Sequence, residues 1–449
     1  MTTDRFGNAL SSETSETTQA IDDFVHGFLA YQPKAANILA AAEAHPDNAL
    51  INAYAGMLWM FLEAPVAAQK AAPYIANAKA AALLNPREAS CVQIAATWTA
   101  GDVPKVMQLC EAHADAYPRD LVIIKLAQYL YFNIGDSPAM LDVAMKAMPA
   151  ANSDPYIHGM IAFGHEQCHN LEQAEASARR AMEIEPNDAW AHHAIAHVML
   201  TQGRVIEGTA FMEEQAPRWE GLNSFMYAHN WWHLALFYIS LGQPEKVLAT
   251  YDAHVWGLEK SFAQDQVGAA SLLARMELAG IDVGDRWDDV AKHIEMRGAD
   301  TTLPFLTMQY LYALGRADSP AAEVLMNAVR EKAATPGFEQ GAWQEVAMPA
   351  CKGLLAHARG EYDVTVARLG PALKRLTEIG GSHAQRDLFA QVHLDALVKA
   401  GHLEQARKTM ERRLKYDPKG IPLNRMLADV YDKMDEPERA KEARLRSYA

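Results

Sequence analysis

The sequence predicts an all-α protein, an α-solenoid built from helical hairpins, on three observations. Apolar residues recur at steps of three and four along almost the whole chain, which is the period of an amphipathic helix. The alternation of apolar and polar residues that is typical of a strand is rare. Turn residues recur at regular intervals, so the helices are expected to pair into repeated hairpins.

Proline marks these intervals. The successive prolines Pro86, Pro118, Pro155 and Pro186 are 32, 37 and 31 residues apart. These steps bracket the roughly 34-residue period of tetratricopeptide repeats. An Asp or Asn beside each proline can cap the helix that follows. We therefore expect a tetratricopeptide-like solenoid that winds as a right-handed superhelix and can close partly on itself.

The predicted domain organisation is simple. Residues 1–20 are polar and have no apolar centre, which predicts a disordered tail and not a secretory signal. No linker rich in Ser, Gly or Pro divides the rest, so residues 21–449 are expected to form one continuous solenoid. Within it, about 156–280 is rich in His and Trp, and about 281–449 holds the C-terminal repeats. No apolar run reaches the roughly 20 residues of a membrane span.

Charge and cysteine content limit the partners and the compartment. The chain has 41 basic and 56 acidic residues, a net charge of −15, which argues against nucleic acid or an anionic membrane as the main partner. Its four cysteines are scattered without a CxxC pair, so we expect a reducing cytoplasm and no thiolate zinc site. No phosphate-binding or dinucleotide motif is present, and no cofactor is expected. The exposed edges of a repeat array often pair, so a homodimer stays an open alternative.

Two histidine pairs lie within 189–251 on neighbouring predicted helices. His193 and His197 are four residues apart, and so are His229 and His233. That spacing places both members of a pair on one face of a helix. The two pairs are 36 residues apart, about one hairpin repeat. Because equivalent helices of successive repeats lie side by side, the four imidazoles can face one cavity.

These imidazoles are either packed histidines bonded to neighbouring turns or functional groups. An imidazole with a pKa of roughly 6.5 can act as a general acid or base, and a neutral one can bind a metal. No Asp or Glu shares the four-residue spacing with either pair, which favours acid–base chemistry, and no metal ligand is assigned. The run HEQCH at 165–169 matches the zinc-protease pattern HExxH. We interpret it as a chance match, because it falls at a turn that places His169 at or beyond the helix end.

The run GGSHAQRD at 380–387 interrupts the repeats. Its two glycines are expected to end one helix in a left-handed turn, and Ser382 to cap the next. The first turn of that helix carries Gln385, Arg386 and Asp387. A helix N-terminus with an arginine beside it is suited to a carboxylate or phosphate. The alternative is that Arg386 and Asp387 only tie neighbouring helices together.

Several stretches resemble the tetratricopeptide repeat protein 38 family. They are DAWAHHAIAHV, FMEEQAPRWEG, AHNWWHLALF, YDAH, GIDVGDRWDDV and GGSHAQRDLF, in this order over about 156–391. The family pattern carries the residue types found here at His193, His197, His229, Asn230, Trp232, His233, Asp252, Asp265, Gln385, Arg386 and Asp387. The chain departs from that pattern at His165, His169, His192 and His383. The resemblance implies a tetratricopeptide-like solenoid but no established activity.

We predict an enzyme that uses His acid–base chemistry on a small polar, carboxylate-bearing metabolite, as an isomerase or racemase, a lyase or a hydrolase. The residues assigned to catalysis are His193, His197, His229, His233, Asp252 and Asp265. Those assigned to the substrate are Asn230, Trp232, Ser382, Gln385, Arg386 and Asp387. Two alternatives stay open. One is a scaffold that binds a peptide or helix in the concave groove, and the other is a His-ligated metal protein.

Overall fold

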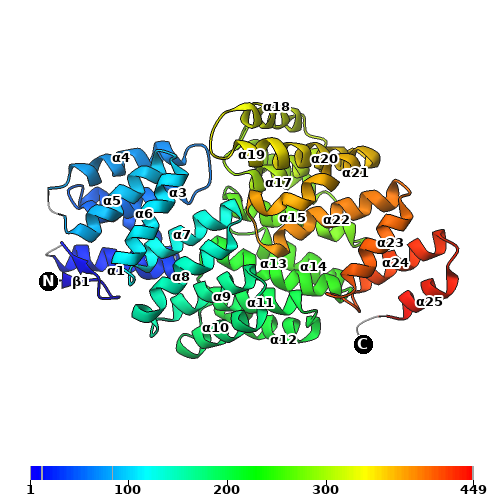
Figure 1. The fold of residues 1–449 in the computed structure, drawn as a ribbon, viewed down its shortest axis with the longest axis horizontal. Helices are drawn as coiled ribbons and strands as arrows, with labels where there is room; N and C mark the ends of the chain where they lie inside the picture. Colours follow the sequence, from blue (N-terminus) through cyan, green and yellow to red (C-terminus); the bar gives the residue numbers. More distant parts are fainter. Residues whose placement is uncertain (1, 12–13, 83, 447–449) are drawn as a thin grey trace. The chain divides into compact units, whose positions relative to one another are not determined.

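A computed structural model describes residues 2–11, 14–82 and 84–446 of the chain. It confirms the all-α class, with consecutive helices packed as tetratricopeptide-like hairpins (Figure 1). The chain forms two compact units. Unit 1 comprises Met1–Ala194 and Trp219–Met226, and unit 2 comprises Ile195–Arg218 and Tyr227–Ala449. One continuous solenoid over 21–449 stays a prediction.

Unit 1 begins with two short strands, and helices follow. Its elements are β1 (Thr2–Thr3), β2 (Ala9–Leu10), α1 (Ser15–Leu29), η1 (Pro33–Ala36), α2 (Asn37–Ala44), α3 (Ala49–Met60), α4 (Ala67–Ala80), α5 (Pro86–Thr99), α6 (Val103–Ala116), α7 (Leu121–Ile134), α8 (Ser137–Ala151), α9 (Pro155–Gln167) and α10 (Leu171–Ile184). The predicted caps are present, since the side chains of Asn85 and Asp154 accept backbone N–H groups at the starts of α5 and α9. The core combines alanines, which let helices approach closely, with larger aliphatic and aromatic side chains.

The N-terminal segment differs from the predicted disordered tail. β1 pairs antiparallel with β2, and α1 begins at Ser15. The polar residues of this segment find partners in the fold: Asp4 and Asn8 are buried, and the Asn8 amide donates to Asp4 at 2.9 Å. The carbonyl of Ala9 accepts from the Arg87 guanidinium at 3.3 Å. A polar composition therefore does not exclude a defined position when buried groups supply the hydrogen bonds.

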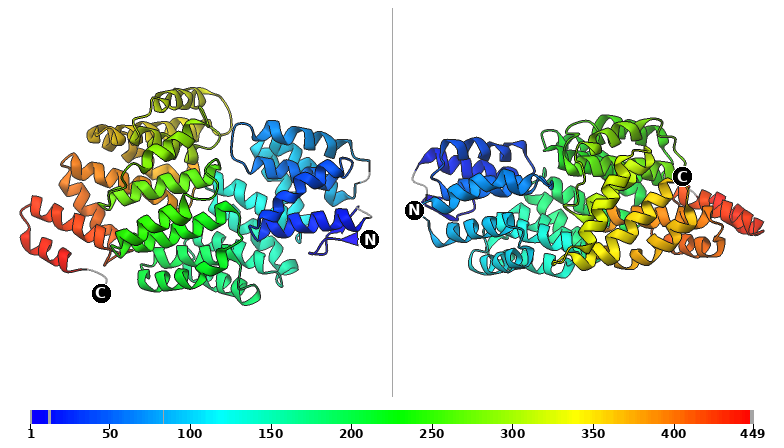
Figure 2. Two further views of the ribbon diagram at one scale, coloured as in Figure 1. Left: turned by 180° about the vertical axis from the view of Figure 1, so that it is seen from behind. Right: turned by 90° about the horizontal axis from the view of Figure 1, so that it is seen from above.

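The remaining elements lie mostly in unit 2. They are α11 (Ala189–Thr201), α12 (Val205–Gln215), η2 (Ala216–Trp219), α13 (Ser224–Ser240), α14 (Pro244–Thr250), η3 (Tyr251–Val255), α15 (Ala263–Leu278), α16 (Arg286–Glu295), α17 (Pro304–Arg316), α18 (Ala321–Ala334), α19 (Gln340–Ala342), η4 (Trp343–Ala347), α20 (Met348–Ala358), α21 (Tyr362–Ala372), η5 (Leu373–Ile379), α22 (His383–Lys399), α23 (Leu403–Arg413), α24 (Ile421–Lys433) and α25 (Pro437–Leu445). Figure 2 shows the last hairpin, α24 and α25, in red. The division between the units falls within α11 and α13.

Unit 2 closes on itself, as the sequence allowed. The turn after α11 has Gly203 at φ +67°, and a Cβ there would collide with the carbonyl of Tyr416. The turn after α13 has Gly242 at φ +63°, where a Cβ would lie 2.9 Å from Ile421. Two hairpin turns at the start of the unit therefore pack against the loop between α23 and α24 and the first residue of α24. Glycine permits both the conformation and the close approach. Consistently, α15 contacts α22.

Candidate functional site

The first helices of two successive hairpins bring the predicted histidines together. The ring centroids of His197 and His233 are 4.5 Å apart, and those of His229 and His233 are 4.9 Å apart. Each of these three residues offers a ring nitrogen within 4.8 Å of the others. His193 lies one turn before His197 on α11 but belongs to unit 1, where its ring stacks on Trp190 with centroids 4.5 Å apart. We call His197, His229 and His233 the imidazole cluster.

The surroundings of His229 favour an uncharged ring. His197 and His233 are almost fully buried, and His229 is partly exposed. Burial lowers the pKa of His229 to about 3, and the neighbouring His197 adds a smaller effect in the same direction. Desolvation disfavours the imidazolium form. At neutral pH the ring of His229 is therefore neutral and keeps a nitrogen lone pair.

Trp232 connects the imidazole cluster to α15. Its ring stacks on His229, with centroids 5.4 Å apart and planes 5° apart, and meets His233 edge-on at 4.8 Å. On its other side, the guanidinium of Arg275 lies 5.5 Å from the indole centroid, within the range of a cation–π contact. Asn230, the predicted substrate-binding residue of the same helix, is fully buried.

The start of α22 has the predicted capped form. Gly380 and Gly381 both have positive φ, and the hydroxyl of Ser382 accepts from the backbone N–H of Gln385 at 3.3 Å. The side chain of Gln385 in turn accepts from the backbone N–H of Ser382 at 2.9 Å, which completes a capping box. The guanidinium of Arg386 folds back to donate to the carbonyls of the two glycines.

Asp387 on α22 connects this helix to α15 and α23 through ion pairs. Arg413 donates two hydrogen bonds to its carboxylate, at 2.6 and 2.8 Å, and a guanidinium nitrogen of Arg275 lies 3.7 Å away. Arg275 also donates to the carbonyl of Ala384 at 2.5 Å. The same arginine thus contacts both Trp232 and the start of α22. The structure therefore places the two regions singled out from the sequence on either side of Arg275.

The two predicted catalytic aspartates lie in different settings. Asp252 belongs to the π-helical turn η3, is largely exposed, and accepts two hydrogen bonds from Arg286 at 2.8 and 2.6 Å. Asp265 is buried in the first turn of α15. Asp252 thus lies on a π-helical turn, which spacing along a regular helix cannot anticipate.

The HExxH match does not form a metal-binding helix. Helix α9 ends at Gln167, and His169 lies beyond it with φ +60°. The ring of His165 is paired instead with the side chain of Asn170, at 3.4 Å. A zinc-protease motif needs both histidines on one face of a continuous helix. The predicted position of His169 at or beyond the helix end is confirmed.

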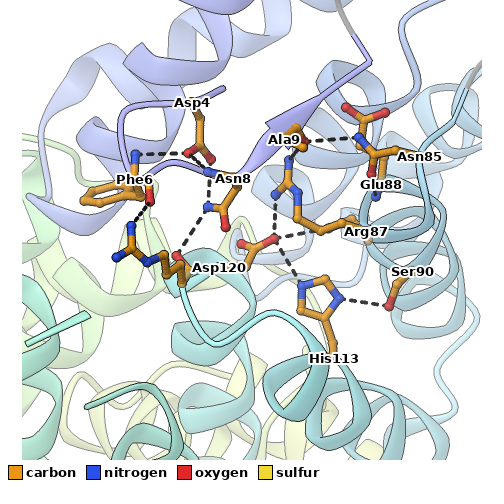
Figure 3. A network of polar contacts seen from close by, with 12 residues as sticks. Asp4, Phe6, Asn8, Ala9, Asn85, Arg87, Glu88, Ser90, His113 and Asp120 are labelled. Atoms are coloured by element: carbon orange, nitrogen blue, oxygen red, sulfur yellow. Dashed lines mark hydrogen bonds and ion pairs between the residues drawn. The ribbon is translucent and has the colours of Figure 1, made fainter. Parts of the chain in front are cut away.

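A second cluster, which was not predicted from the sequence, lies in unit 1. Cys91 on α5, His113 on α6 and Asp120 at the start of α7 each place a potential ligand atom within 4.8 Å of the others. Figure 3 shows His113 and Asp120 of this cluster, with Arg87 beside them. The Asp120 carboxylate contacts His113 at 3.1 Å and the Cys91 thiol at 3.5 Å. It also accepts from the guanidinium of Arg87 at 2.6 Å. The sequence signal was the four-residue step from Arg87 to Cys91, which is weak because the partners lie 22 or more residues away.

Electrostatics distinguish this second cluster from a metal site. Burial alone would raise the pKa of Asp120, but the Arg87 guanidinium and a hydrogen bond from His113 hold it well below its usual range. Burial, with a smaller contribution from Asp120, raises the pKa of the Cys91 thiol far above its usual value. A metal ligand must be a thiolate, so a protonated thiol beside a fixed cation is a poor donor. We call Arg87, Cys91, His113 and Asp120 the arginine cluster.

Comparison with known proteins yields fold-level likenesses. No family model matches the chain. It is similar to a human IFIT1 dimer solved with PPP-AAAA, at 12% identity and TM-score 0.42, over 95% of this chain and 94% of that one. It is also similar to the Naa15/Naa10 complex bound to HypK-THB, at 13% identity and TM-score 0.26, over 96% of this chain and 68% of that one. Among the described residues, no helix is long and apolar enough to cross a membrane.

Proposed function

We propose that the imidazole cluster binds a divalent transition metal, so that the protein is a His-ligated metal protein. The observation that carries this proposal is the convergence of ring nitrogens from His197, His229 and His233 within 4.8 Å of one another. Neutral imidazole is the commonest protein ligand for such metals. The proposal also gives a role to three of the positions at which the chain resembles the tetratricopeptide repeat protein 38 family.

Protonation favours a metal over the acid–base enzyme predicted from the sequence. A general base works best with a pKa near the operating pH. Burial holds the pKa of His229 at about 3, so this ring is a weak proton acceptor at pH 7. Because of this low pKa, protons do not compete with a metal for the nitrogen lone pair of His229. Metal binding is therefore the main hypothesis, and proton transfer by these rings is the alternative.

The donor set indicates the class of metal. Three imidazole nitrogens suit Zn²⁺, Co²⁺, Ni²⁺ or Cu²⁺ better than Mg²⁺ or Ca²⁺, which prefer oxygen ligands. Zinc–nitrogen bonds of roughly 2.0–2.1 Å place tetrahedral ligands about 3.3 Å apart, so the rings would rotate slightly inward. Three protein ligands leave one coordination position open, as in catalytic zinc sites.

The first test is a Co²⁺ titration of the metal-stripped full chain, followed by visible absorption and competition with Zn²⁺. We expect one tightly bound ion, and at least a tenfold loss of affinity in His197→Gln and His233→Gln, because each removes a ligand. His193→Gln is expected to lose less. His402→Gln is the matched control, since that histidine is 43% exposed and lies outside the cluster. No binding at micromolar Co²⁺, or equal losses in all variants, would contradict the proposal.

The same variants address the scaffold alternative. If the protein only binds a peptide or helix in a groove, His233→Gln changes neither metal content nor stability in the presence of metal. Metal analysis of protein purified without added metal then decides between the metal-protein hypothesis and the scaffold hypothesis. Zinc or a related ion at close to one equivalent, absent from His233→Gln, supports the metal protein. A metal-free chain that resists reloading would favour the scaffold.

A further inference from the structure

Trp232 holds a polar group at the edge of the proposed metal centre. Its indole ring contacts both His229 and His233, at centroid distances of 5.4 and 4.8 Å. The residue is only 1% exposed, and its Nε1–H has no hydrogen-bond partner within the described part of the chain. Buried N–H groups of folded proteins are almost always bonded to protein, water or ligand. At Trp232 this donor belongs to a ring that contacts two of the proposed metal ligands, so an acceptor bound beside them can take up its hydrogen bond.

The charges near Trp232 show which kind of acceptor fits. The guanidiniums of Arg275 and Arg413 both lie beside the carboxylate of Asp387, and Asp417 also acts on Arg413. Arg275 is 4% exposed, and burial lowers its pKa to about 10 despite the opposing effect of Asp387. A divalent metal held by the imidazole cluster would add two positive charges on the other side of Trp232 from Arg275. Buried charge is costly unless it is paired, so an anion is favoured over a neutral ligand.

We propose that the metal centre binds a small oxyanion, with one oxygen on the open coordination position and another accepting the Nε1–H of Trp232. This inference rests on the proposed metal function and names the class of its exogenous ligand. Arg275 acts through its charge, because its guanidinium already donates to the carbonyl of Ala384 and lies against the indole face. A carboxylate and a phosphate share this chemistry, so the experiment includes both.

The experiment uses the full chain loaded with Co²⁺ and titrated with acetate, inorganic phosphate or chloride at constant ionic strength. We expect one oxyanion to change the Co²⁺ absorption spectrum saturably, and chloride to do so far more weakly. Trp232→Phe keeps a ring over His229 but removes the N–H. It should retain Co²⁺ affinity within about threefold and lose at least tenfold in oxyanion affinity, which corresponds to one hydrogen bond to a charged group.

Trp343→Phe is the matched control. Trp343 lies in unit 2, is fully buried, and also has an Nε1–H without a partner in the described structure, but it belongs to η4. Its replacement should leave oxyanion affinity unchanged. A second measurement needs no variant: with ¹⁵N-labelled indoles, one of the nine tryptophan Nε1–H resonances should shift with oxyanion and not with chloride. This readout applies even if Trp232→Phe fails to fold.

The outcomes separate this inference from the metal proposal. If Co²⁺ binds but neither acetate nor phosphate alters its spectrum or any indole resonance, the oxyanion inference is wrong and the metal function stands. Equal oxyanion affinity in wild type and Trp232→Phe would also overturn it. If Co²⁺ does not bind at all, both fail. A response to acetate alone assigns carboxylates as the ligand class, and a response to phosphate alone assigns phosphates.

Discussion

The imidazole cluster and the arginine cluster both bring three potential metal ligands within 4.8 Å, yet they differ in charge. The imidazole cluster consists of nitrogen donors, and its His229 is held neutral by burial. The arginine cluster already contains a cation, because Arg87 lies 2.6 Å from the Asp120 carboxylate. Close donor atoms are thus insufficient to indicate a metal. A carboxylate that is already paired with a fixed cation needs no metal ion to balance its charge, whereas a cluster of neutral donors has no cation of its own.

The largest effect is expected in the arginine cluster. Arg87→Met should lower the free energy of unfolding of unit 1 by about 3–5 kcal/mol, because it leaves the Asp120 carboxylate buried without its cation. Urea unfolding followed by circular dichroism measures the change. Arg119→Met is the matched control, since Arg119 is exposed and its guanidinium donates a long, 3.5 Å hydrogen bond to the carbonyl of Phe6. A loss below about 1 kcal/mol, or an equal loss in both variants, would show that the ion pair is not what holds this cluster.

Metal should stabilise the chain through the imidazole cluster alone. At a free concentration 100 times the dissociation constant, Zn²⁺ or Co²⁺ should add about 2.7 kcal/mol to unfolding, and a chelator should remove it. Thermal unfolding with and without metal measures the effect. The double variant His197→Gln/His233→Gln should show no shift, whereas Arg87→Met should keep the shift on its lower baseline. A shift that survives the double variant would place the metal elsewhere.

The comparison also shows what the sequence could predict. The imidazole cluster follows from two local periods, the four-residue step along a helix and the repeat between successive hairpins, so His197, His229 and His233 could be placed together without coordinates. The arginine cluster combines α5, α6 and the start of α7 with the strand residue Ala9, and no period connects these segments. The approach of Arg275 to both Trp232 and Ala384 likewise depends on closure within unit 2, which the sequence only allowed.

Acid should weaken the arginine cluster in a defined pH range. The pKa of Asp120 lies well below its unfolded value of roughly 3.9, so the folded state binds its proton less readily than the unfolded state. The stability from this pair is therefore complete above about pH 5 and is lost as the pH falls through the folded pKa. Asp120→Asn lacks this titration. Its deficit in melting temperature relative to wild type should shrink below about pH 4. A deficit that is constant from pH 7 to 3 would contradict the prediction.

The smallest effect is expected for Cys91, and it tests the comparison most directly. Burial keeps this thiol protonated, so it should not bind the metal that occupies the imidazole cluster. Chain loaded with excess Co²⁺ should show no sulfur-to-cobalt charge-transfer band, and Cys91→Ala should leave the visible spectrum and the stoichiometry unchanged. Cys351, which is also buried and has a raised thiol pKa, provides the matched control as Cys351→Ala. A charge-transfer band that disappears only in Cys91→Ala would mean that a metal can displace Arg87 from Asp120. The charge distinction between the two clusters would then not hold.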